Sequence, residues 1–198
     1  MALNLTPRFS ITLALALLLA PALALAERTE YDVDYLVRFQ PEQGQAAVSI
    51  RLTPGTGEVR RMRLAMPEDR YGSVSGDGEV SRKGDIVTWV PPRGEPARLR
   101  FTYRIDKQRR GGGYDARITD DWVIVRGDHL IPPATVAATP GADSRARLRF
   151  QLPKGWTNVD TPFKRSRDGK SFVIANAERR FDRPTGWIIA GQVGTRRE

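Results

Sequence analysis

His129 is the residue best suited to chemistry, because it is the only histidine of the chain and lies in the stretch RGDHLIPP at 126–133. Imidazole titrates nearest neutral pH and is the commonest metal ligand. A catalytic zinc site needs three protein ligands, usually including two histidines or a cysteine, and this sequence has one histidine and no cysteine. We therefore expect no metal site and no cofactor.

A serine–histidine–acid triad needs only one histidine, and several serines could serve beside His129. These are Ser73, Ser75, Ser144 and Ser166. None of them lies in the G-x-S-x-G motif that holds a nucleophile at a strand-to-helix turn. A small hydrolase that uses His129 therefore stays a less favoured alternative.

Carboxylates gather in the segment YDARITDDW, where Asp115, Asp120 and Asp121 could bind calcium or act as acid and base on a sugar. The spacing of an EF-hand is missing, and the consecutive aspartates before Trp122 are more typical of a turn that enters a strand. An enzyme built on this cluster would need His129 and these carboxylates in one pocket, with perturbed pKa values.

The elements that must position these residues are strands, because apolar and polar residues alternate with a period of two. In 31–39 the apolar set is Tyr31, Val33, Tyr35, Val37 and Phe39. In 97–106 it is Leu99, Phe101, Tyr103 and Ile105, and the polar set includes Arg98, Arg100 and Arg104. Such segments form strands with one face in water, so the simplest interpretation of these three arginines is a solvated sheet face.

Further strands are predicted at 46–52, 59–66, 85–90, 122–126, 145–152, 171–176 and 187–193. Clusters of glycine and proline separate them, and no segment has the pattern of an amphipathic helix. RGDHLIPP is predicted to be the end of a strand followed by a corner at Pro132-Pro133. We expect an all-β fold, either an antiparallel β-sandwich or a saddle-like double sheet.

The first 26 residues resemble a secretory signal peptide, with Arg8 before an apolar run and small residues at Ala24-Leu25-Ala26. We expect cleavage there, a single domain over 27–198, and a periplasmic or secreted protein. Removing Arg8 leaves 31 basic residues against 23 acidic ones, a net charge of +8. An exported basic protein meets anionic lipid, acidic polysaccharide or acidic protein rather than nucleic acid.

Three further groups of basic residues lie close together in the sequence. The clusters are Arg60, Arg61 and Arg63; Lys107, Arg109 and Arg110; and Arg179, Arg180 and Arg183. They are candidates for one converging patch, which the sequence alone cannot place.

Four segments, in this order, resemble the N-terminal β-domain of the glycyl-aminopeptidase (M61-like) metallopeptidases, a branch of the gluzincins. They are WVPPRGEPARLRFTYRID, YDARITDDWVIVRGDHLIPPA, RLRFQLPKGWTNVDTPF and FDRPTGWIIAGQVGTRR. The most specific parts are Leu152–Trp156 and Arg183–Gly191. In such proteins the β-domain precedes a catalytic domain whose H-E-x-x-H motif binds zinc. That motif is absent here, so the resemblance implies the fold and a supporting role, and no catalytic residue.

We therefore expect an exported, noncatalytic β-domain, a truncated or stand-alone relative of the M61-like N-terminal domain that binds a peptide or protein partner, such as a separate catalytic chain. An alternative is a basic module that binds anionic lipid or polysaccharide of the cell envelope. The predicted binding residues are the aromatic anchors Trp89, Trp122, Trp156 and Trp187 and the charge partners Arg109, Arg110, Arg179 and Arg180. Buried tryptophan in a sheet core is the competing interpretation of the four anchors.

Overall fold

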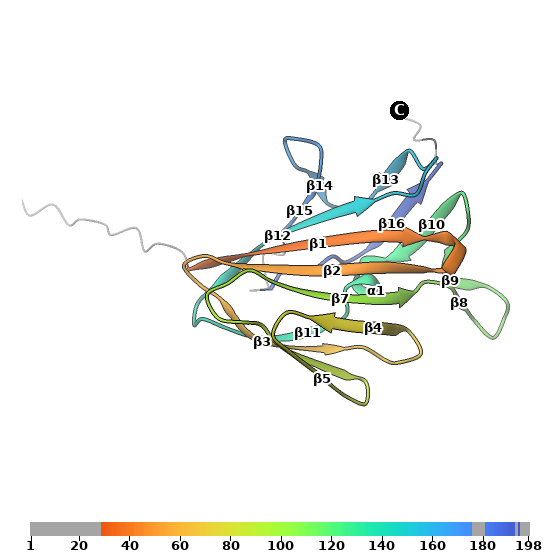
Figure 1. The fold of residues 1–198 in the computed structure, drawn as a ribbon. Helices are drawn as coiled ribbons and strands as arrows, with labels where there is room; N and C mark the ends of the chain where they lie inside the picture. The colour runs from red at the N-terminus through yellow and green to blue at the C-terminus, as the bar shows by residue number, and fades with distance from the viewer. Residues whose placement is uncertain (1–28, 176–180, 193, 195–198) are drawn as a thin grey trace, which may run out of the picture.

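The protein is described by a computed structural model, which covers residues 29–175, 181–192 and 194 and is nearly all-β (Figure 1). Its described helices are short: the 3-10 turn η1 (Pro41–Gln43) and the single-turn helix α1 (Gly127–Leu130). No helix in the described part of the chain is long and apolar enough to cross a membrane. The predicted signal peptide, residues 1–26, lies outside the described residues.

The largest sheet has seven strands in the order β14-β15-β12-β1-β2-β7-β4. Their bounds are Lys164–Arg165, Phe172–Ile174, Asp143–Gln151, Glu30–Gln40, Gln45–Pro54, Ala97–Arg104 and Tyr71–Gly76. Neighbouring strands run antiparallel except β1 and β12, which are parallel over Glu30–Arg38 and Asp143–Gln151. The fold is therefore mostly antiparallel, as predicted, with one parallel pair that joins segments more than a hundred residues apart.

Two smaller sheets complete the fold. The five-stranded sheet has the order β13-β16-β10-β9-β8, with bounds Asn158–Asp160, Trp187–Gly191, Trp122–Arg126, Tyr114–Ile118 and Lys107–Gln108. The four-stranded sheet has the order β11-β3-β6-β5, with bounds Ala134–Ala138, Val59–Ala65, Ile86–Val90 and Glu79–Lys83. In Figure 1 the five-stranded sheet and α1 lie behind the seven-stranded sheet, and the four-stranded sheet lies along its lower edge.

The three sheets share one hydrophobic core, which is built from the apolar residues of the predicted alternating pattern. All five apolar residues predicted for 31–39 are buried, and so are Leu99, Phe101, Tyr103 and Ile105 of 97–106. Residues from the smaller sheets, including Met62, Leu64, Val123, Val125 and Ile188, are fully buried in the same cluster. Burial of one face of each sheet therefore accounts for the fold, as the alternation predicts.

The all-β prediction is confirmed, with three sheets where a double sheet was expected. The chain crosses between the seven-stranded and four-stranded sheets more than once, from β2 to β3, back to β4, and from β4 to β5 through Asp77 and Gly78. The strands β4 and β5, YGSVSG and EVSRK, carry few apolar residues, so their sequences did not predict them. The prediction for RGDHLIPP is confirmed as well: β10 ends at Arg126, α1 follows, and β11 begins after Pro132-Pro133.

Candidate functional site

The outer face of the five-stranded sheet carries a band of exposed and half-buried apolar side chains. It comprises Trp122 and Ile124 of β10 and Trp187 and Ile189 of β16, and we call it the apolar strip. Trp187 is 47% exposed and Ile189 is 38% exposed, while Trp122 and Ile124 are half-buried. The intervening residues Val123, Val125, Ile188 and Ala190 point inward and are fully buried.

Strand register brings the strip together. In the antiparallel pair β10–β16, Ile124 lies opposite Ile189, Trp122 opposite Gly191 and Arg126 opposite Trp187. Directly opposite and diagonal side chains on one face of a sheet are in contact range. Because Gly191 has no side chain, β16 lies close beneath Trp122: a Cβ at Gly191 would be 2.6 Å from the Trp122 Cα.

Polar residues flank the strip on both sides. On β13, Asn158 lies opposite Gly191 and Asp160 opposite Ile189. On β9, Arg117 lies opposite Ile124. An apolar, aromatic centre with a polar rim is the composition of protein–protein interfaces.

Arg126 connects the strip to α1. Its guanidinium carbon lies 5.6 Å from the centre of the Trp187 ring, a cation–π distance. Its Nε donates to Asp128 Oδ1 at 3.1 Å. Burial raises the pKa of Asp128, but hydrogen bonds and the Arg126 charge outweigh this and leave the pKa below its usual range. The carboxylate therefore stays ionised and holds Arg126 beside Trp187.

Of the four predicted aromatic anchors, the structure places Trp122 and Trp187 on one face, at opposite ends of the β10–β16 pair with Ile124 and Ile189 between them, and places the other two in the core. Trp89 is fully buried, and its Nε1 donates to the Asp77 carbonyl oxygen at 2.7 Å. Trp156 is 6% exposed and its Nε1 donates to the Asp120 carbonyl oxygen at 2.6 Å. Both indoles have their apolar surface and their N–H satisfied internally, which argues against a role in binding.

The predicted charge partners do not border the strip as a group. Arg109 is exposed beside the β8–β9 hairpin and pairs with Asp115, while Arg110 is exposed in the turn of that hairpin. Arg179 and Arg180 lie outside the described residues. The three predicted basic clusters fall on different elements. Arg60, Arg61 and Arg63 are on β3 and Lys107 is on β8, in separate sheets. Arg183 is half-buried and donates to the Ile131 carbonyl oxygen at 3.0 Å.

His129 does not meet the carboxylates that a hydrolase would need. It lies in α1, past the end of β10, whereas Asp120 and Asp121 lie before the start of β10, so the five residues of the strand, about 17 Å of chain, separate them. Burial lowers the pKa of His129; the Asp128 carboxylate opposes this, and the charges of Lys107, Arg126 and Arg70 add to it. The imidazole is therefore neutral at pH 7.

Within residues 29–175, 181–192 and 194, no group of three or more histidine and acidic side chains could hold a metal ion. The predicted carboxylates have structural roles or face solvent: Asp115 pairs with Arg109, and Asp120 and Asp121 are exposed in the turn before β10.

Solved structures with a similar fold come from longer peptidases. An aminopeptidase N family protein from Idiomarina loihiensis aligns with a TM-score of 0.56 and 11% identity, over 81% of this chain and 29% of that chain. The M1 zinc metallopeptidase of Deinococcus radiodurans aligns with a TM-score of 0.39 and 16% identity, over 82% of this chain and 41% of that chain. Aminopeptidase A of Legionella pneumophila aligns with a TM-score of 0.38 and 11% identity, over 82% of this chain and 21% of that chain.

No protein-family model and no curated protein sequence matches this chain. The chain spans less than half of each of the three peptidases. At these identities the likeness shows the fold: an all-β domain similar to one found within an aminopeptidase N family protein. It carries no catalytic residue over to this chain.

The apolar strip includes two residues that sequence reasoning missed, Ile124 and Ile189. Alternation in WVIVR and WIIAG marked both strands, but runs of apolar residues on both faces hid which face is exposed. The sequence did contain a signal: Trp122 and Ile124 are two positions apart, as are Trp187 and Ile189, so each pair lies on one face of its strand.

Proposed function

We propose that this protein is a noncatalytic binding domain that docks a protein partner onto the apolar strip. The observation that supports this proposal is the exposed pair Trp187 and Ile189, continuous with Trp122 and Ile124 across β10 and β16. Contiguous exposed apolar surface with a polar rim marks interaction sites on soluble proteins. Tryptophan and arginine, here Trp187 and Arg126, are the side chains on which binding energy most often concentrates.

The partner we propose is a separate catalytic chain or domain of the zinc metallopeptidase type. The support is the fold likeness to part of an aminopeptidase N family protein, in which a domain of this shape belongs to a much longer chain. The finer assignment to the M61-like branch is part of the proposal and rests on the segments Leu152–Trp156 and Arg183–Gly191. The second segment contains β16, so the resemblance and the apolar strip fall on the same residues.

We also propose that binding takes place after export, since residues 1–26 have the pattern of a signal peptide. The absence of cysteine means that the complex would be held by packing rather than by disulfides in an oxidising compartment. Burial of Trp187 would then contribute much of the affinity, and its truncation would cost about 2 kcal/mol or more of binding free energy.

Site-specific photo-crosslinking tests this function. A photoreactive phenylalanine derivative replaces Ile189 in one variant and Val173 in a control, because Val173 is 45% exposed but lies on β15 of the seven-stranded sheet. Each variant is irradiated in the native exported-protein extract. We expect a product from position 189 whose partner carries an H-E-x-x-H motif, and no such product from position 173.

Adding Trp187→Ser to the position-189 variant should abolish that product, with the fold checked by circular dichroism. Equal crosslinking from both positions would mean unspecific contact. No product at position 189, or only partners without the zinc motif, would contradict the proposal.

A further inference from the structure

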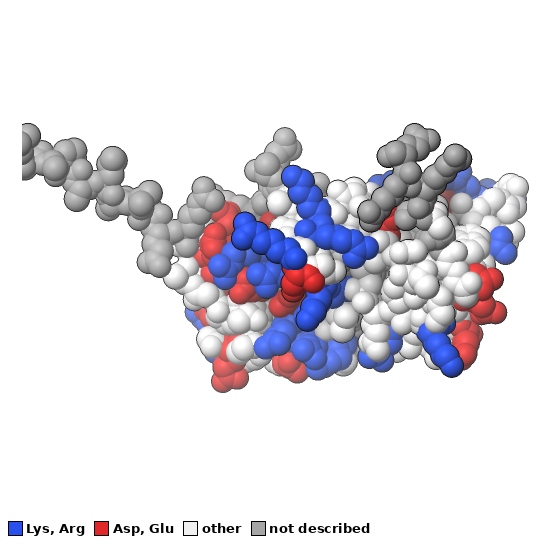
Figure 2. All heavy atoms as spheres, turned by 90° about the horizontal axis from the view of Figure 1, so that it is seen from above, with Lys and Arg blue, Asp and Glu red and all other residues white. Residues whose placement is uncertain are grey.

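The outer face of the seven-stranded sheet is rich in arginine. The outward positions of β1, β2, β7 and β12 carry the arginines Arg38, Arg51, Arg98, Arg100, Arg104 and Arg147. Arg145 and Arg149 lie on the same face but pair with Asp32 at 2.8 Å and with Asp34 at 3.8 Å. Figure 2, seen from above, shows many basic side chains gathered toward one end of the face that is turned to the viewer, with acidic ones among them.

Arg51 and Arg98 lie directly opposite each other across β2 and β7. Like charges in this position destabilise a sheet. Neither guanidinium has a hydrogen-bond or ion-pair partner among the described residues, and Arg100 beside them reaches Asp77 only at 3.8 Å. Two carboxylates lie near them on this face: Asp34 is opposite Arg51 on β1, and Asp77 accepts from the Arg98 backbone N–H at 2.9 Å. The three arginines Arg51, Arg98 and Arg100 still outnumber these two carboxylates.

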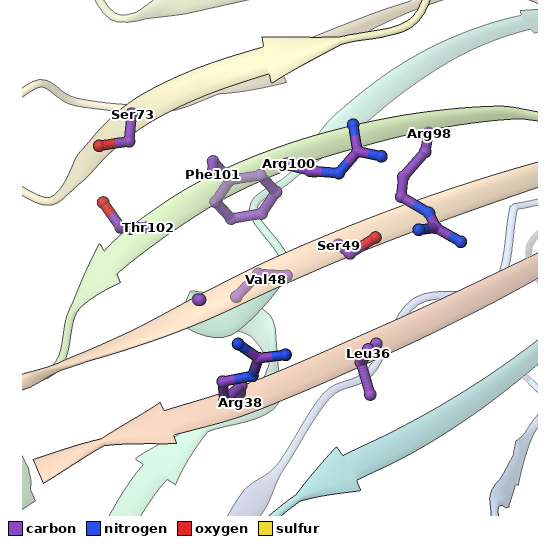
Figure 3. Close-up of a pocket in the computed structure, with 10 residues that line it drawn as sticks. Leu36, Arg38, Val48, Ser49, Ser73, Arg98, Arg100, Phe101 and Thr102 are labelled. Atoms are coloured by element: carbon purple, nitrogen blue, oxygen red, sulfur yellow. The ribbon is translucent and has the colours of Figure 1, made fainter.

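A hollow of about 290 Å³ lies beside these arginines on the same face. Leu36, Ala47 and Val48 contribute its apolar lining, and Arg38, Arg98 and Arg100 its charges. Figure 3 shows that the arginines come from β1 and β7, on either side of the stretch Val48–Ser49 of β2. Cationic groups around an apolar surface are suited to an anionic ligand that also has aliphatic parts.

A bulge in β4 shapes one side of the hollow. Across the β4–β7 pair, Gly72 faces Thr102 and Ser75 faces Arg100, so Ser73 and Val74 together oppose Phe101 alone. Ser73 has φ +48°, the only positive φ of a non-glycine residue in the described part of the chain. Bulges and left-handed non-glycine residues are concentrated at functional sites. The hydroxyls of Ser73 and Thr102 both line the hollow.

We propose that this hollow binds an extended acidic segment of a protein, with carboxylates at alternate positions. Arg98 and Arg100 lie two residues apart on one face of β7, about 7 Å along the strand. An extended peptide presents side chains at alternate positions with the same spacing. Two glutamates in a Glu-x-Glu sequence thus match the two guanidiniums, which bind carboxylates in a bidentate manner.

The next alternate position of the ligand would lie over Ala47, which faces Thr102, the residue two positions after Arg100. On β1, Arg38 lies opposite Ala47, and Leu36 lies diagonally to it, opposite Ser49. A leucine there would pack on the apolar lining, so the preferred segment has the pattern Glu-x-Glu-x-Leu. This apolar lining favours a peptide over a sulfated polysaccharide, which has no aliphatic side chain to bury.

The binding of synthetic peptides tests this site. The peptide fluorescein-Gly-Glu-Gly-Glu-Gly-Leu-Gly-amide, labelled on its N-terminal amine, is titrated with the protein and followed by anisotropy, beside the same peptide with glutamine for glutamate. We expect Arg98→Gln and Arg100→Gln each to weaken binding by about tenfold, the loss of a charge-assisted contact. Arg104→Gln is the matched control: it has the same charge, strand and face, but Arg104 does not line the hollow.

Equal loss from all three variants would show that only net charge matters and would overturn the proposal. Lack of binding at about millimolar protein, or equal binding of the glutamine peptide, would overturn it too. Binding of heparin or of phosphatidylglycerol vesicles without binding of the peptide would assign the face to an envelope polyanion instead. Trp187→Ser should leave peptide affinity unchanged, because the apolar strip is on another sheet, so this site and the proposed function fail independently.

Discussion

Replacing Gly191 with alanine tests the close approach of β10 and β16, on which the apolar strip depends. A Cβ at this position would lie 2.2 Å from the Asp121 carbonyl oxygen and 2.6 Å from the Trp122 Cα. Gly191 also has φ +143°, a conformation that residues with side chains rarely adopt. Because both neighbouring atoms belong to the backbone, the end of one strand has to move, and Trp122 moves with it.

The cost is the sum of strain and lost pairing. Holding alanine at this φ costs about 1–3 kcal/mol. Moving the strands apart weakens the hydrogen bonds Gln192 N–H to Asp121 O (2.9 Å) and Thr157 N–H to Gly191 O (3.2 Å), and each contributes about 1 kcal/mol net. We therefore expect Gly191→Ala to lower the free energy of unfolding by about 4 kcal/mol, a large part of the stability of a typical domain.

Urea unfolding followed by tryptophan fluorescence measures this loss, with two glycines as controls. Gly141 has φ +76° and open space around it, so Gly141→Ala adds strain alone and should cost about 1 kcal/mol. Gly111 has open space and no positive φ, so Gly111→Ala should be neutral. A loss for Gly191→Ala no larger than that for Gly141→Ala would refute the steric argument, whereas failure of Gly191→Ala alone to fold would agree with it.

Two further predictions concern a buried hydroxyl and a half-buried imidazole. Tyr35→Phe should lower the free energy of unfolding by about 1 kcal/mol or more, because it removes the hydrogen bond that the buried Tyr35 hydroxyl donates to the Asp182 carbonyl oxygen at 2.8 Å. His129→Gln should reduce the loss of stability between pH 7 and pH 5. The folded pKa of His129 lies below its ordinary value of 6.5, so the unfolded chain binds the proton more readily than the folded protein. The wild-type protein therefore loses stability as the pH drops below 6.5, and the glutamine variant does not share this loss.

Tyr103→Phe is the control for the tyrosine. Arg70 donates to the Tyr103 hydroxyl at 2.9 Å but also to two backbone carbonyls, so it keeps partners when that hydroxyl is lost. Equal losses for the two variants would mean that the Tyr35 hydrogen bond has no special weight. For His129, urea midpoints at several pH values provide the measurement, and an unchanged pH dependence in the glutamine variant would show that other groups control it.

Much of the fold was predictable because alternation is a local property. In 31–39 and 97–106, every residue predicted to face inward is buried. The weak strands β4 and β5 were missed, since YGSVSG and EVSRK have too few apolar side chains to show a period. Their place is decided by pairing with β7 and β6, contacts that no short segment contains.

The candidate sites were predictable only in part. Trp122 and Trp187 were selected for their chemistry, and the structure places them on one face, but the same reasoning selected Trp89, which is in the core. Burial of a tryptophan depends on which sheet covers its strand. The basic residues show the reverse error: Arg98 and Arg100 were interpreted as a solvated strand face, and they border the hollow.

The sequence by itself determined that the chain forms sheets, which side of each long strand is buried, and that a zinc site of the peptidase type cannot be built from one histidine and no cysteine. Only the tertiary structure decided that β1 pairs in parallel with β12, that Ile124 meets Ile189, and that Arg51 faces Arg98. The physical reason is that side chains alternate between the two faces of a strand, so the sequence of one strand shows which face each residue is on. Which residue faces it from the next strand depends on register, and register is settled by packing between segments distant in the sequence.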